Sequence, residues 1–91
     1  MCTMIAEKVK VDGSGRGNQG WFTVNQADVS FDHPFNAPFE YALNIDFVNE
    51  SLGPSARVAV ELSESAAREL VRTILSVLNE AEAGGYLRKS G

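Results

Sequence analysis

Cys2 has the most reactive side chain that the sequence offers, because it is the only cysteine and directly follows Met1. Removal of Met1 would leave a free amino-terminal cysteine, whose α-amino group and thiol can both act as nucleophiles. Such a residue can also capture an aldehyde or chelate a metal ion through nitrogen and sulfur. The alternative is that Cys2 is a small apolar residue at the start of an edge strand.

His33, the only histidine, is the candidate for a general base that activates the Cys2 thiol. Asp32 or Glu7 would orient the imidazole, which gives the nucleophile, base and acid arrangement of many hydrolases. Asp32 and His33 are adjacent, however, and neighbours in a regular strand point to opposite faces of the sheet. His33 also shares the phase of the apolar residues before it, which favours a structural histidine beside the proline loop that follows.

The same side chains could instead hold a metal ion, since thiolate, imidazole and carboxylate are its usual ligands. The candidates are Cys2, Glu7, Asp28, Asp32, His33 and Asp46. None of them stands in a C-x-x-C or H-x-x-x-H spacing, so we assign no metal site. The sequence implies no particular cofactor.

A polar ligand site is the third candidate, formed by Trp21, Asp32, Asn44 and Asp46. We expect residues 33–40 to close an antiparallel hairpin. Its register brings Asp28 opposite or diagonal to Asn44 and Asp46. A row of like charges has three explanations: a solvated outer face, a site for a cation or a small polar molecule, or an interface satisfied by arginine from another copy.

Residues 15–20 match the letters G-x-G-x-x-G of a dinucleotide-binding loop. That loop must open a helix whose amino terminus holds the pyrophosphate, and here an aromatic, strand-like segment follows instead. Residues 12–20 therefore form a hairpin turn or a mobile loop rather than a phosphate site.

Four segments alternate apolar and polar residues, which is typical of strands. The segments are residues 3–11, 21–33, 41–48 and 57–62. Within the second segment the apolar phase changes at residues 25–28, which predicts a bulge or a tight turn. The pattern does not decide between one bent strand and two short ones.

A single helix is expected after the last strand, because Ser63 is a suitable N-cap, Glu64 complements the helix dipole, and Gly84 with Gly85 ends the helix. Its apolar residues recur at three- and four-residue spacing: Ala67, Leu70, Val71, Ile74, Leu75, Leu78 and Ala81. The expected fold is α+β, an antiparallel sheet of about four strands in the order β-β-β-β-α with the C-terminal helix packed on one face. Residues 1–85 form the single domain and residues 86–91 a flexible tail.

Composition excludes two classes of partner. The net charge is −4 and no basic stripe is present, so neither nucleic acid nor an anionic membrane surface is an expected partner. No apolar run could span a bilayer and the amino terminus lacks a signal sequence, while a single cysteine suits a reducing compartment. We expect a cytoplasmic protein.

Chain length favours self-association. A chain of 91 residues buries only about 60% of its unfolded surface, and one helix cannot cover both faces of a sheet. We expect a homo-oligomer, most simply a dimer, formed through the sheet face that the helix leaves open.

Five short segments together resemble a family of small actinobacterial proteins of unknown function. The likeness runs over nearly the whole chain up to the end of the helix, and it implies a bacterial origin but no activity, cofactor or catalytic residue. The segments are residues 1–3, 20–22, 32–35, 42–49 and 57–63.

The expected function is a non-catalytic binding or interaction module that self-associates, with a small molecule as one candidate ligand. One alternative is a small enzyme that uses Cys2, His33 and an acidic partner on a carbonyl or acyl compound. The other alternative is a metal-binding protein that uses Cys2, His33 and carboxylates.

Overall fold

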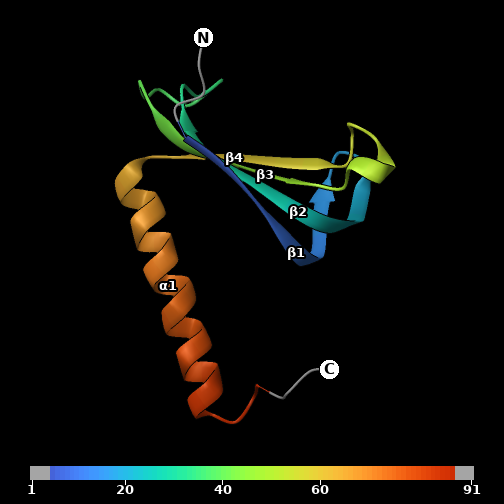
Figure 1. Cartoon of the computed structure of the whole chain (residues 1–91). Helices are drawn as coiled ribbons and strands as arrows, with labels where there is room; N and C mark the ends of the chain where they lie inside the picture. Colours follow the sequence, from blue (N-terminus) through green and yellow to red (C-terminus); the bar gives the residue numbers. More distant parts are fainter. Residues whose placement is uncertain (1–4, 88–91) are drawn as a thin grey trace.

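The structure, a computed structural model, describes residues 5–87 (Figure 1). Its strands make one antiparallel sheet in the order β1-β2-β3-β4, and one helix follows. The elements are β1 Ile5–Gly17, β2 Gly20–Asp32, β3 Ala42–Val48, the short 3-10 helix η1 Glu50–Leu52, β4 Arg57–Leu62 and α1 Glu64–Ala83. The predicted α+β class and the order of its elements are confirmed. No helix within residues 5–87 combines the length and the apolar composition needed to cross a membrane.

The first hairpin is longer than predicted. β1 continues to Gly17 instead of ending near Val11, and only two residues separate it from Gly20, whose φ of 108° suits glycine. Gly13, Gly15 and Gly17 alternate along this part of β1. The segment expected to be a loop is therefore half of a long hairpin.

The predicted irregularity near residues 25–28 lies in one continuous strand, β2. The extra residue is on its neighbour, because Lys10 pairs with Gln26 whereas Gly13 pairs with Val24. Two residues of β1 thus oppose one residue of β2, which is a β-bulge. It bends the first hairpin so that the end of β1 reaches β4, where a Cβ on Gly15 would lie 3.6 Å from a methyl carbon of Val58.

The sheet has two chemically different faces. Directly paired residues share a face, so the register defines an apolar face of three rows across the four strands. The rows are Ile5, Phe31, Leu43 and Leu62; Glu7, Val29, Ile45 and Val60; and Val9, Ala27, Phe47 and Val58. The residues between these rows form the polar face.

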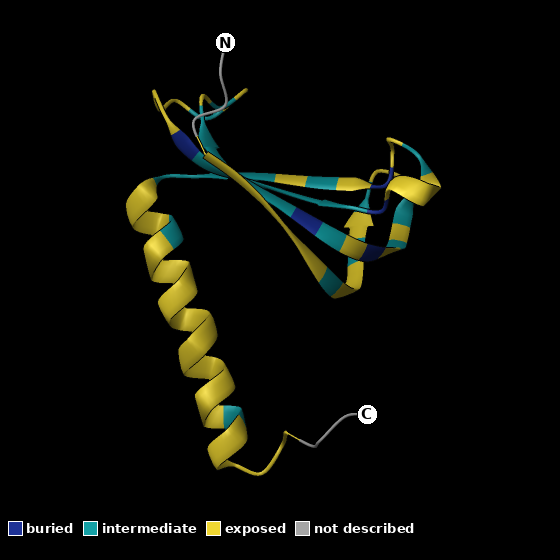
Figure 2. Ribbon diagram, viewed as in Figure 1, coloured by how far each residue is buried: buried dark blue, intermediate teal, exposed yellow. Residues whose placement is uncertain are grey.

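Few side chains of the single chain are buried. The buried apolar residues are Val24, Ala27, Ala42 and Ala56, and no large side chain among the described residues is fully buried. On the apolar face, Ile5 and Val9 are more than half exposed. Helix α1 therefore does not cover the apolar face (Figure 2), and the end of β1 lies against this face at Phe47 and Val58.

Asn49 is the one buried polar residue of the described chain. Its Nδ2 donates to the carbonyl of Thr23 at 3.0 Å, and its Oδ1 accepts from the backbone N–H of Ser51 at 3.2 Å and from the Ser51 hydroxyl at 2.7 Å. These bonds cap η1 and tie the loop before β4 to β2.

Helix α1 has the predicted ends. The Ser63 hydroxyl accepts from the backbone N–H of Ala66 at 3.2 Å, and the helix stops at Ala83 before Gly84. The predicted packing of α1 on its own sheet is not what the structure shows. Every residue of α1 except Ala67 and Ala81 is exposed, and the helix leaves the sheet at its edge (Figures 1 and 2). The physical reason is the connection, since Ser63 alone joins β4 to α1.

Candidate functional site

A charged row crosses the middle of the polar face. Asp28 lies directly opposite Asp46, one of the two residues predicted to be opposite or diagonal to it. Lys8 Nζ lies 3.7 Å from Asp28 Oδ1, and Arg57 Nη2 lies 2.8 Å from Asp46 Oδ1. Both carboxylates are thus paired with cations of their own chain, so an arginine from another copy is not needed to neutralise them.

A polar hollow of about 570 Å³ lies beside this row. It brings together three of the four residues predicted to bind a ligand, namely Asp32, Asn44 and Asp46. Trp21 lies elsewhere, at the start of β2, with 70% of its surface exposed. The hollow is lined by Ser30, Asp32, His33, Phe35, Asn44, Asp46, Arg57, Ala59, Val60 and Glu61.

Asn44 is the residue of this hollow whose hydrogen bonding is incomplete. Its Nδ2 donates to the carbonyl of Asp32 at 3.5 Å, whereas its buried Oδ1 has no partner among the described residues. A buried amide oxygen is normally hydrogen-bonded. Because this oxygen is buried, a ligand reaches it only if the Asn44 side chain moves.

Glu61 organises the loop that borders the hollow. Its carboxylate accepts from the backbone N–H groups of Phe35 at 2.6 Å, Asn36 at 3.1 Å and Ala37 at 2.7 Å. The donors of Ala37 and Phe35 hold the pKa of Glu61 below its ordinary value of 4.5. Sequence reasoning missed this role, because the partners of Glu61 are main-chain groups of a proline-containing loop and carry no side-chain signal.

Acidification is expected to release this loop. Because the pKa of Glu61 is lower in the folded chain than its ordinary value, its hydrogen bonds stabilise the loop above about pH 4.5 and are lost as the pH falls through the lowered pKa. NMR should show the amide signals of Phe35 and Ala37 moving together in one acidic step. In Glu61→Gln that step should be absent, and an unchanged step in this variant would contradict the account.

The three residues of the enzyme hypothesis are not brought together by the described part of the chain. Cys2 lies outside the described residues. His33 is exposed, its Nδ1 lies 2.9 Å from the carbonyl oxygen of Glu40, and its ring stacks on Tyr41 at 4.7 Å. Glu7 lies on the apolar face opposite Val29, and no hydrogen bond or ion pair of the described residues joins it to His33. The contacts of His33 are those of a side chain that closes the β2–β3 loop.

Asp32 contributes to the same loop. Its Oδ1 accepts from the backbone N–H of His33 at 2.7 Å rather than from the imidazole. Among residues 5–87 no group of three side chains that could hold a metal ion is present.

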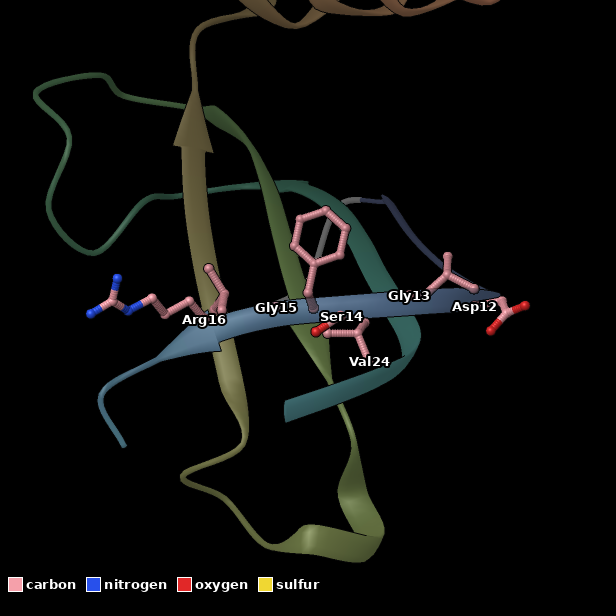
Figure 3. A pocket seen from close by; sticks show the side chains of 9 residues that line it. Asp12, Gly13, Ser14, Gly15, Arg16 and Val24 are labelled. Carbon is pink, nitrogen blue, oxygen red and sulfur yellow. The ribbon is translucent and has the colours of Figure 1, made fainter. Parts of the chain in front are cut away.

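An apolar hollow of about 280 Å³ opens where β1 crosses the other strands (Figure 3). Val24, Phe47 and Val58 form its apolar wall, and Gly13 and Gly15 leave the space open. In Figure 3 the side chains of Asp12 and Arg16 point away from it in opposite directions. Sequence reasoning missed this hollow. The sequence feature that could have indicated it is the glycine at every second residue, at positions 13, 15 and 17, because a period of two is typical of a strand.

Substitution of Gly15 by valine is expected to destabilise the sheet by about 1–3 kcal/mol, because overpacking forces neighbours to move. A Cβ on Gly15 would lie only 3.0 Å from a methyl carbon of Val24. Gly13→Val is the matched control, since nothing lies within 4 Å of its Cβ position. Urea unfolding at one chain concentration measures both. Equal losses of unfolding free energy in Gly15→Val and Gly13→Val would show that β1 is not held close to β2 and β4 at Gly15.

Comparison with known proteins gives a family but no activity. No curated protein and no solved structure matches the chain. A family model described as a family of unknown function, DUF6295, matches residues 1–87. The match covers every element of the sheet and the helix. The chain therefore belongs to the DUF6295 family of proteins of unknown function.

Proposed function

We propose that this chain is a non-catalytic interaction module that works as a homo-oligomer, with a dimer as the smallest form. The observation that carries the proposal is the apolar side of α1, which no other element within residues 5–87 covers. We call it the helix stripe, and its residues are Ala67, Leu70, Val71, Ile74, Leu75, Leu78 and Ala81. Leu70, Ile74 and Leu78 along its centre are 43%, 49% and 47% exposed. Large contiguous apolar surfaces on a folded chain mark interaction sites.

The surface of the whole chain supports the same proposal. It exposes 7215 Å², whereas a compact monomer of 9.9 kDa exposes roughly 5,200 Å². Its radius of gyration is 15.1 Å, compared with about 12 Å for a compact domain of this length. The excess of about 2,000 Å² per chain corresponds to about 4,000 Å² in a dimer, which is within the range of obligate homodimers.

Unfolding at several chain concentrations tests the proposal. If folding and association are coupled, mass action raises the thermal midpoint by roughly 5–10 °C for a hundredfold increase in chain concentration. A midpoint that stays constant over that range would refute self-association as the source of stability.

Self-association through the apolar face leaves the polar hollow open to solvent. Contact of a small ligand with Asp32, Asn44 and Asp46 in this hollow stays a prediction. Their acceptors would suit a ligand that donates hydrogen bonds.

A further inference from the structure

In one chain α1 does not cover the apolar face, most of which lies beyond the end of β1, and we infer that each copy places α1 on the apolar face of its partner. This inference rests on the proposed function and specifies the partner surface. The arrangement is a reciprocal helix exchange, in which two sheets are each covered by the helix of the other chain. Exchange of an identical element is a common route to dimers.

The connection between β4 and α1 favours exchange over folding back. Ser63 is the only residue between Leu62 and Glu64, and its φ of −67° and ψ of 161° are extended. Connections between strands and helices that pack on each other commonly have two to six residues. One extended residue cannot reverse the chain, and short connections of this kind promote exchange.

The dimensions of the two surfaces agree. From Ala67 to Ala81 the helix stripe is about 21 Å long, and a helix with its side chains is about 10 Å wide. The apolar face is about 14 Å across four strands and about 13 Å along them. One helix lying diagonally is therefore large enough to cover the part of the face that the end of β1 leaves open.

The charges also agree with this placement. Glu7 is the only charged residue in the three rows of the apolar face, and it stands on the edge strand β1, where water can reach it. On α1 the ion pair Glu69–Arg72, at 2.6 Å, lies outside the helix stripe, and the pair Glu64–Arg68, at 2.7 Å, begins in the first turn, ahead of Ala67. Burial of the stripe on the face thus leaves no unpaired charge at its centre, which would be costly.

Inter-copy cross-linking tests this arrangement on the full chain. Two variants in a Cys2→Ser background are co-expressed, one with Glu7→Cys on the sheet and the other with Leu78→Cys on the helix stripe. A short bismaleimide should join the two different chains into a covalent heterodimer. The control pairs Glu7→Cys with Ser76→Cys, which lies on the opposite side of α1, and its yield should be at least tenfold lower.

The outcomes separate the inference from the proposed function. A chain that is monomeric before cross-linking overturns both. A dimer that joins Leu78→Cys only to Leu78→Cys of the partner, through a helix–helix interface, overturns the exchange while self-association stands. Equal yields from the two cysteine positions on α1 would also overturn the exchange.

A longer connection gives an independent readout. Insertion of Gly-Ser-Gly-Ser between Leu62 and Ser63 should let each helix reach its own sheet, and most of the protein should then have the mass of one chain. If this variant remains wholly dimeric, the short connection does not enforce the exchange and the inference is wrong. Circular dichroism confirms that the variant has kept its helix.

Discussion

Replacement of Ile74 by glutamate is expected to weaken self-association by at least about a hundredfold, because an unpaired carboxylate buried in an interface costs several kcal/mol and each 1.4 kcal/mol is about tenfold in affinity. Ile74 lies at the middle of α1 and is 49% exposed in the single chain. A glutamate side chain at this position can therefore extend into solvent without a clash within its own chain. Sedimentation velocity over a range of concentrations measures the loss.

Ser76→Glu is the control for this substitution. It adds the same charge to the same helix, two residues away, on the side opposite the helix stripe, and glutamate is a good helix former. Association should stay within about twofold of the original chain, in line with a surface change of at most about 0.5 kcal/mol. Equal weakening by Ile74→Glu and Ser76→Glu would show that the stripe is not the interface.

Asn49→Ala is expected to cost about 2–3 kcal/mol, because it deletes the buried hydrogen bonds of one side chain and leaves a carbonyl on β2 without its donor. The lost bonds are those to Thr23 and Ser51. Urea unfolding at a fixed chain concentration measures the loss, and the slope of the transition should not change.

Asn36→Ala deletes the same side chain at an exposed position of the β2–β3 loop. It should change stability by no more than about 0.5 kcal/mol, as surface substitutions usually do. If Asn49→Ala is as mild as Asn36→Ala, then the loop that precedes β4 is not held to β2 in the way the structure shows.

Local patterns were sufficient for the elements themselves. The alternation of residues 41–48 predicted β3, and the predicted hairpin between β2 and β3 placed Asp28 opposite or diagonal to Asn44 and Asp46. Ser63 predicted the start of α1, since its hydroxyl was the cap that the first turn needs. These features depend on neighbours in sequence or on a single hairpin.

The length of β1 could not be predicted in this way. Glycine is depleted in strands, so the segment with Gly13, Gly15 and Gly17 was expected to be a loop. In the structure Gly15 and Gly17 come close to other residues of the sheet, and side chains of Val24 and Phe22 crowd the positions that a Cβ would take there. Tertiary packing outweighs propensity here.

The covering partner of α1 could not be predicted either. An amphipathic helix shows that a stripe must be buried, but its sequence does not say which sheet buries it. The expectation of packing within one chain omitted the length of the connection at Ser63, which is the feature that sends α1 away from its own sheet.

The residues that strand pairing brings together in the candidate site were predictable from the sequence. The contacts that side chains of this site make with backbone N–H groups were not. Asp32, Asn44 and Asp46 lie together because β2 and β3 pair as expected. The role of Glu61 was missed because its donors are backbone N–H groups.

Sedimentation equilibrium of the unmodified chain tests the central claim most directly, since the claim is that two copies bury the surfaces that one copy exposes. The account predicts a mass of about twice the 9.9 kDa of one chain at micromolar concentration. A mass of 9.9 kDa that persists up to the highest soluble concentration would contradict it.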